Sequence, residues 1–217
     1  MRGRRGAIRL AVLAALAVGL GTMPAVSPPL PAAPLDNQLT AARTVRTSLG
    51  DGVVVSLSEE GIFVEAVPQK GEGLYAFTRR LCGEDQRAPQ IVAANGGAQV
   101  LHSGVRYRVP FDLLSNEWQL RAVRALFPMD KGQADGWRHE ARGVGPLQRE
   151  SIWQLSLWFT GTGENFRAIR EYNEFLDDDV ARGTAVVIPS ELLRPAFRAV
   201  LVEQRSGCGF PALSVAP

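Results

Sequence analysis

The sequence ESIWQLSLWFTGTGENFRAIREYNEFLDDDVARGTAVVIPSELL, residues 150–193, contains the clearest local structural signals in the chain. Ser151 is followed three positions later by Gln154, the pairing of a capping box, in which each side chain bonds the backbone N–H of the other residue. Apolar residues then recur at helical spacing until the Gly-Thr-Gly sequence at 161–163. The stretch therefore predicts a helix that begins just after Ser151.

A second helix and a strand are predicted in the rest of this stretch. The helix is expected over residues 164–172, with Asn173 ending it in the left-handed conformation. A polar loop over residues 174–182 follows, and the β-branched residues 185–188, closed by proline, predict a strand. Two helices and one strand bury little apolar surface alone, so we expect residues 137–144 to supply a partner strand.

The same order of elements is expected upstream. Two β-branched runs within residues 53–67 flank Gly61, which suits a hairpin turn. A helical pattern, an asparagine and a short strand closed by proline follow. One interval of 21 positions and one of 6 positions recur in both copies. The residues that bound them are Leu74, Asn95, Gly104 and Pro110 in the first copy and Ile152, Asn173, Gly183 and Pro189 in the second.

The duplicated pattern resembles the LysM module, a family that binds polymers containing N-acetylglucosamine. The first copy reads Gly-Glu-x-Leu, Ile-x-x-x-Asn and Gly-x-x-x-x-Val-Pro, and the second Glu-Ser-Ile, Ile-x-x-x-Asn and Gly-x-x-x-x-Ile-Pro. The resemblance implies an α+β protein with two β-α-α-β modules, residues 53–114 with a preceding hairpin strand and residues 137–193. A helix and loop, residues 115–136, join them. The tandem arrangement also resembles the non-catalytic N-terminal half of certain bacterial cell-wall amidases.

The resemblance also implies a shallow sugar groove in each module, between the loop after the first strand and the loop before the last strand. Backbone groups and glycines suit this role because sugars offer hydroxyl and acetamide groups at close range. In the first module residues 71–74 would face residues 96–103, and in the second residues 149–152 would face residues 174–182. The expected groove residues are Gly71, Glu72, Gly73, Leu74, Asn95, Gly96, Gly97 and Leu101, and Arg149, Glu150, Ser151, Ile152, Asn173, Leu176, Asp177 and Val180.

Three positions depart from the family pattern. Gly73 stands where a serine or threonine usually caps the helix, and Arg149 replaces a glycine. The acidic residues 177–179 crowd the expected groove of the second module, either as a solvated loop or as a determinant of ligand choice. Either module could therefore have lost sugar binding and serve as a spacer.

The N-terminal segment of the sequence predicts export. Arginines followed by a short apolar run within residues 1–27 match a signal peptide, whereas an uncleaved anchor helix is the alternative. Residues 28–52 are expected to form a proline-rich linker, and residues 194–217 a helical and then disordered tail. We expect the mature protein in the periplasm or cell envelope, without a stable membrane span.

Composition argues against several other functions. The net charge of +2 and the lack of a basic, aromatic-rich face argue against nucleic acid as a partner. His102 and His139 each lack a second ligand at metal-binding spacing, so we expect no metal, no cofactor and no catalytic residue. Cys82 and Cys208 could form a disulfide in an oxidising compartment, although a free thiol or a bond between two chains is an open alternative.

The sequence therefore predicts an exported, non-catalytic protein that binds peptidoglycan or a related N-acetylglucosamine glycan. A cell-wall hydrolase is a further expected partner. Two alternatives remain: an adaptor whose LysM-like modules bind a protein, and the targeting half of a split or truncated N-acetylmuramoyl-L-alanine amidase.

Overall fold

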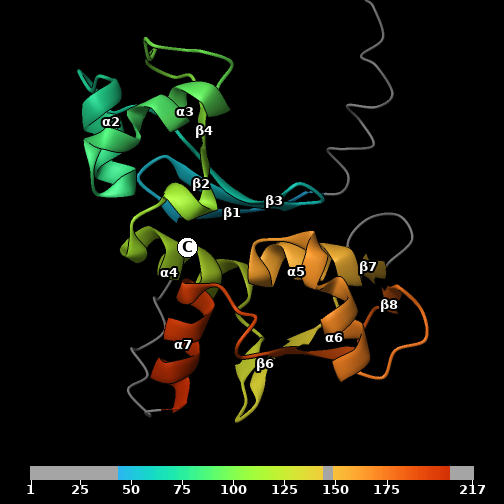
Figure 1. Cartoon of the computed structure of the whole chain (residues 1–217). Helices are drawn as coiled ribbons and strands as arrows, with labels where there is room; N and C mark the ends of the chain where they lie inside the picture. Colours follow the sequence, from blue (N-terminus) through green and yellow to red (C-terminus); the bar gives the residue numbers. More distant parts are fainter. Residues whose placement is uncertain (1–43, 144–148, 206–217) are drawn as a thin grey trace, which may run out of the picture. The chain divides into compact units, whose positions relative to one another are not determined.

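The structure is a computed structural model that describes residues 44–143 and 149–205. In this part the chain is α+β, and its strands form three small antiparallel sheets beside the helices (Figure 1). The predicted signal peptide and residues 28–43 of the predicted linker lie outside the described residues, as do residues 206–217 of the predicted tail. No described helix is long and apolar enough to cross a membrane.

The largest sheet has four strands in the order β1-β2-β3-β4. They are Val45–Gly50, Val53–Ser58, Gly61–Ala66 and Tyr107–Pro110. β2 and β3 form the hairpin expected around Gly61, whose φ of 119° suits glycine. β1 corrects the linker prediction, because five of its six residues pair with β2 instead of belonging to a linker. Its sequence reads as polar because β1 is an edge strand with several exposed positions.

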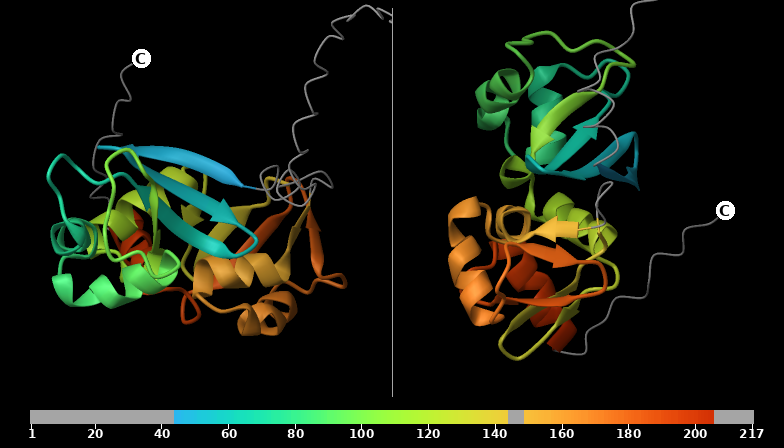
Figure 2. Two further views of the ribbon diagram at one scale, coloured as in Figure 1. Left: turned by 90° about the horizontal axis from the view of Figure 1, so that it is seen from above. Right: turned by 90° about the vertical axis from the view of Figure 1, so that its right-hand side faces the viewer.

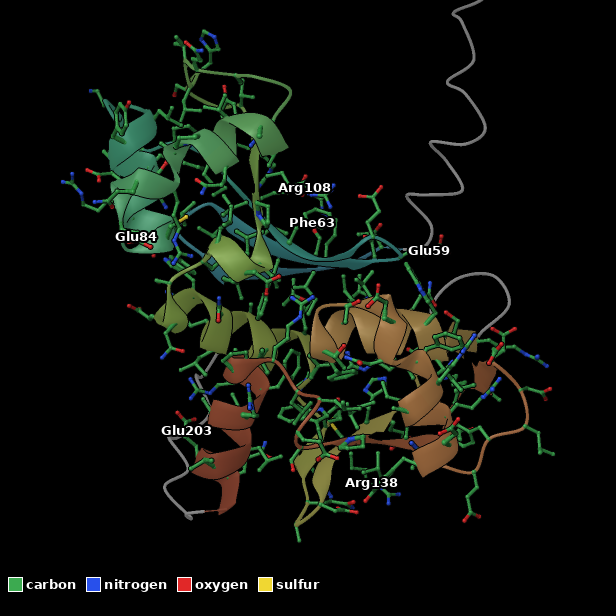
Figure 3. All side chains as sticks on the ribbon, in the orientation of Figure 1. Glu59, Phe63, Glu84, Arg108, Arg138 and Glu203 are labelled. Atoms are coloured by element: carbon green, nitrogen blue, oxygen red, sulfur yellow. The ribbon has the colours of Figure 1, made fainter. Side chains whose placement is uncertain are left out.

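Two helices connect β3 to β4. They are α2, Leu74–Cys82, and α3, Ala88–Ala94, joined through a 3-10 turn at Asp85–Arg87. Both helices lie against one face of the sheet (Figure 2). Across the pair β3–β4, the guanidinium of Arg108 lies 3.9 Å from the ring centre of Phe63 (Figure 3). We call β3-α2-α3-β4 the first unit.

The same order recurs in a second unit, β6-α5-α6-β9. Its elements are Gly136–Glu140, Ile152–Thr160, Phe166–Tyr172 and Ala185–Pro189, with a 3-10 turn at Gly163–Asn165. β6 pairs with β9, and the short strand β5, Lys131–Gly132, pairs with the other edge of β6. β9 passes so close to Gly136 that an added Cβ atom would lie 2.1 Å from the Ile188 carbonyl oxygen. Only glycine fits at the start of β6.

Equivalent asparagines join the second helix of each unit to its last strand. Asn95 Nδ2 donates to the carbonyls of Ile91 and Arg108, both at 2.8 Å, and Asn95 Oδ1 accepts from Arg108 N at 2.8 Å. Asn173 makes the same bonds to Ile169 and Val187. The predicted left-handed conformation is wrong for Asn173, whose φ is −94°; Glu174 adopts it instead, with φ of 55°. The side chain of Asn173 does the capping.

Two further helices complete the described fold. They are α4, Asn116–Leu126, after a 3-10 turn at Phe111–Leu113, and α7, Pro195–Arg205. The helix predicted at the start of the tail is present as α7, and the side chain of Phe197 on it is fully buried against Phe127, Trp137 and Phe159. The buried side chains of α7, which are Ala196, Phe197, Val200 and Leu201, are therefore part of the core.

Side-chain hydrogen bonds from Trp158 and Arg194 link the second half of the chain to the first. Trp158 Nε1 on α5 donates to the carbonyl of Ser58 at 2.7 Å. Arg194 donates to Asp112 Oδ1 at 3.1 Å and to the Leu157 carbonyl at 2.7 Å. The two units thus share a packed boundary within the described residues.

Candidate functional site

The two predicted groove loops of the second unit are joined by backbone pairing. β7, Arg149–Ser151, pairs with β8, Asp179–Ala181, through three residue pairs, and Ile152 N donates to the Asp178 carbonyl at 2.8 Å. Part of the predicted polar loop 174–182 is therefore a strand. The backbone groups that were expected to face a sugar here bond to one another.

Ser151 is the N-cap residue of α5. Its hydroxyl accepts from Gln154 N at 3.1 Å, and Gln154 Oε1 accepts from Ser151 N at 3.0 Å, which completes the predicted capping box. Ile152 and Val180 are buried, so their side chains contribute to the core. Asn173 is likewise engaged in its capping bonds.

A small hollow lies within the second of these loops. It has a volume of about 170 Å³ and is lined in part by Leu176 and Asp177, both predicted groove residues. Leu176 is 96% exposed. The complete lining is Phe175, Leu176, Asp177, Asp179, Val180, Ala181 and Thr184. Residues 149–152 do not line it, so this hollow is not a groove between two walls.

Glu150 faces the interior, contrary to its prediction as a groove residue. Its side chain is 1% exposed, and strand alternation in β7 directs it inward between Arg149 and Ser151. Glu150 Oε2 lies 2.9 Å from His139 Nε2, and Oε1 accepts from Arg142 N at 3.0 Å. The loop is therefore anchored to β6 through a buried carboxylate.

His139 bonds a second carboxylate through its other ring nitrogen. Nδ1 lies 2.7 Å from Asp130 Oδ2, which also accepts from Trp137 Nε1 at 2.8 Å. Burial lowers the pKa of His139, but its hydrogen bonds to Asp130 and Glu150 more than offset this effect and raise the pKa to about 9. His139 is therefore protonated at neutral pH. We call Asp130, His139 and Glu150 the acidic–histidine cluster.

In the sequence His139 has no second ligand at metal-binding spacing, and nothing there connects the members of the cluster. They come from the turn before β5, from β6 and from β7, so no local motif joins them. Arg142 adds a second positive charge, with Nη2 3.6 Å from Asp130 Oδ1. Two cations and two carboxylates therefore meet in this region, and their charges balance.

Hydrogen bonds to the Glu72 carboxylate hold the loop before α2 in the first unit, residues 67–73. The carboxylate accepts from Arg80 Nε at 2.7 Å and from Gln69 N at 2.7 Å. Burial raises the pKa of Glu72, but the hydrogen bonds from Arg80 and from Gln69 N and the positive charge of Arg80 together more than offset it, so the net pKa lies below the usual range. Gly71 adopts a φ of 77°, while Gly73 caps α2 without a side-chain bond. Leu74 packs against the core.

The loop after α3 in the first unit exposes glycine backbone. Gly96 and Gly97 have φ values of 66° and 88°, and an added Cβ atom would meet nothing within 4 Å at either position. The same holds at Gly71 and Gly73. Leu101 is partly buried against the core, whereas Val100 is 67% exposed.

The equivalent loops of the two units therefore differ in their backbone pairing. Among the described residues, none of the three sheets includes a strand from residues 67–73 or 95–106. The backbone of the first unit's loops is thus not engaged in strand pairing, whereas β7 and β8 pair in the second unit.

Two observations on the described residues bear on metal binding and on thiol reactivity. In that part of the chain no three His, Cys, Asp or Glu side chains are placed to hold a metal ion. Cys82 is a buried free thiol whose pKa is raised by burial to about 11, which disfavours the nucleophilic thiolate. Its predicted partner Cys208 lies outside the described residues.

Comparison of the chain with protein-family models, with curated proteins and with solved structures found no match.

Proposed function

We propose that this protein is exported and binds peptidoglycan, or a related N-acetylglucosamine polymer, without catalysing its cleavage. The observation that carries the proposal is the open pair of glycine-containing loops in the first unit, residues 71–74 and 96–103. They occupy the positions of the expected groove in a β-α-α-β unit whose strands pair antiparallel. The repetition of this unit, with equivalent asparagine bonds, supports its LysM-like character.

The chemistry of the first unit suits an uncharged sugar. Sugar hydroxyl and acetamide groups need donors and acceptors at short range, and a glycine backbone can supply both without side-chain obstruction. Tyr75, 65% exposed at the start of α2, and the exposed side chain of Val100 add apolar surface in the same two segments. Glu72 is held by Arg80 and keeps the first loop in shape.

The second unit has a different expected contribution. Its β7–β8 pairing uses the backbone groups that a glycan would need, so we expect the first unit to supply most of the affinity. A single weak site of millimolar strength contributes about 4 kcal/mol. A cell-wall hydrolase that binds both this protein and the glycan would raise retention further, because linked sites bind the polymer together.

Sedimentation with purified peptidoglycan tests the proposal. The mature protein should pellet with the polymer, and Gly73→Leu should remain in the supernatant, because a leucine side chain fills the open space beside the first loop. Gly73 has a φ of −87°, which leucine adopts without strain. Glu117→Leu is the matched control, since it adds the same side chain at an exposed position on α4.

Three outcomes would count against this proposal. Mature protein that stays in the supernatant with intact peptidoglycan refutes glycan binding. Sedimentation that Gly73→Leu does not weaken, with the variant folded by near-UV circular dichroism, moves the site away from the first unit. Retention that soluble N-acetylglucosamine oligomers fail to compete would favour a protein partner instead.

A further inference from the structure

The β7–β8 ribbon is too short to persist by its own hydrogen bonds. Each strand has three residues, and isolated two-stranded ribbons are at best marginally stable in water. The charges of Arg149 and Asp179 keep its outer positions exposed. Its persistence therefore depends on what anchors it to the rest of the second unit.

The polar anchor is the carboxylate of Glu150, which lies opposite the buried side chain of Val180 on β8. It is the buried member of β7, and its two oxygens meet His139 Nε2 at 2.9 Å and Arg142 N at 3.0 Å. His139 lies on β6, which is paired on both edges and is the central strand of its sheet. One side-chain interaction thus connects the ribbon to the most constrained strand of the unit.

The remaining groups around His139 fix its position and charge. Asp130 binds Nδ1, and Arg142 lies beside both carboxylates. Phe127 from α4 and Phe159 from α5 pack against the imidazole and carry no charge. Without His139, two carboxylates would remain in a buried region with only Arg142 to balance their charge. The free energy of Glu150 would then be lower in water than in the protein interior.

The first unit shows what happens when this anchor is missing. Glu72 occupies the position of Glu150, two residues before the first helix, but it binds Arg80 on that helix instead of a strand. The counterpart of His139 is Ala66, because Ala66 pairs with Tyr107 and His139 with Val186, each three residues before the closing proline. Alanine cannot hold a carboxylate, and the equivalent loops of the first unit form no strand pair among the residues described.

We propose that the acidic–histidine cluster is a latch that holds β7 against β8 and thereby keeps the second unit closed to glycan. The identity of the excluded ligand as a glycan rests on the proposed function. The role of the latch in holding the ribbon rests on the contacts alone. Releasing Glu150 frees the backbone of residues 149–152 and 179–181 to accept and donate hydrogen bonds to a ligand. The second unit is then an autoinhibited copy of the first.

Amide hydrogen exchange tests the latch without any glycan. In Glu150→Ala, amides of the β7–β8 ribbon should exchange about tenfold faster or more, whereas amides of the β6–β9 pair should keep their protection. His139→Ala, which copies the first unit, should give the same pattern. Glu140→Ala, at an exposed position on β6, is the matched control and should leave the ribbon unchanged.

If amide exchange accelerates equally in the β7–β8 and β6–β9 pairs, the cluster only stabilises the fold. If exchange in the β7–β8 ribbon does not change, the cluster does not hold the ribbon. Either result overturns the latch. Peptidoglycan sedimentation is then measured for Gly73→Leu with and without Glu150→Ala. Regained binding in the double variant supports autoinhibition, and its absence, when the unaltered protein binds, overturns it. If the unaltered protein does not bind, the proposed function fails while the exchange result still decides the latch.

Discussion

The side chain of Asn173 bonds both backbone groups of Val187, and so joins the end of α6 to the middle of β9. Its Oδ1 accepts from Val187 N at 2.7 Å, and its Nδ2 donates to the Val187 carbonyl at 2.8 Å and to the Ile169 carbonyl at 2.7 Å. An amide is the side chain that can donate and accept at this one point. The equivalent bonds of Asn95 explain why both units need asparagine here.

Asn173→Ala should therefore lower the free energy of unfolding by about 2–3 kcal/mol, because the N–H and the carbonyl of Val187 lose their partner and the Ile169 carbonyl keeps only the bond from Asn173 N. Asn173→Asp should also destabilise, since a carboxylate accepts from Val187 N but cannot donate to either carbonyl. Urea unfolding followed by circular dichroism measures both. Asn116→Ala, at an exposed position on α4, serves as control. A loss below about 0.5 kcal/mol for Asn173→Ala would show that the bonds are dispensable.

Stability should fall as the pH rises through the pKa of His139. That pKa is about 9 in the folded protein against an ordinary value of 6.5, so the folded state binds the proton more tightly. The stabilisation is fully present below about pH 6.5 and is lost as the pH rises through 9, an effect on the order of 3 kcal/mol. The quantity to measure is the free energy of unfolding between about pH 6 and pH 10.

His139→Gln should remove this dependence, so that the stability difference between the unaltered protein and the variant shrinks toward high pH. His102→Gln, which changes an exposed histidine in the first unit, should follow the unaltered protein at every pH. A constant difference between the unaltered protein and His139→Gln across this range would mean that the cluster does not hold a proton more tightly than the unfolded chain.

The repeat and its capping signals could be predicted because they are local. Ser151 and Gln154 lie three positions apart, and the asparagine recurs at an equal interval after each helix start. Those signals were sufficient to order the helices and strands of both units. They also assigned Asn173 to the helix end, although its side chain, and not its backbone conformation, performs the capping.

Long-range pairing could not be predicted in the same way. β1 was assigned to a linker because an exposed edge strand has the polar composition of a linker. Glu150 and His139 lie 11 positions apart on different strands, and Asp130 comes from a third segment. Charged residues in a sequence indicate surface, and only the folded arrangement shows that these charges compensate one another inside the protein.

Trp158 is expected to couple the two halves of the described chain. Its indole is 1% exposed, and Nε1 donates to the Ser58 carbonyl at the β2–β3 turn. Trp158→Phe should cost about 1–3 kcal/mol, because it leaves that carbonyl without its donor and removes packed volume. Differential scanning calorimetry should show one transition for the unaltered protein and a broadened or divided transition for the variant.

Trp153→Phe is the matched control, since Trp153 lies on the same helix but is 48% exposed. It should shift the transition much less and leave its shape unchanged. A single sharp transition in Trp158→Phe at the original temperature would show that this contact does not couple the units.

The caps of the two first helices should respond in opposite directions. Ser151 completes a capping box on α5, so Ser151→Ala should destabilise by about 1 kcal/mol. α2 begins at Gly73 without a side-chain bond, and its φ of −87° and ψ of 175° suit serine as well. Nothing lies within 4 Å of a Cβ atom there, so Gly73→Ser should stabilise by a few tenths of a kcal/mol. Chemical denaturation measures both changes. Destabilisation by Gly73→Ser would contradict this prediction. Because nothing obstructs a Cβ atom there, such a result would mean that the loop needs the backbone freedom of glycine at this position.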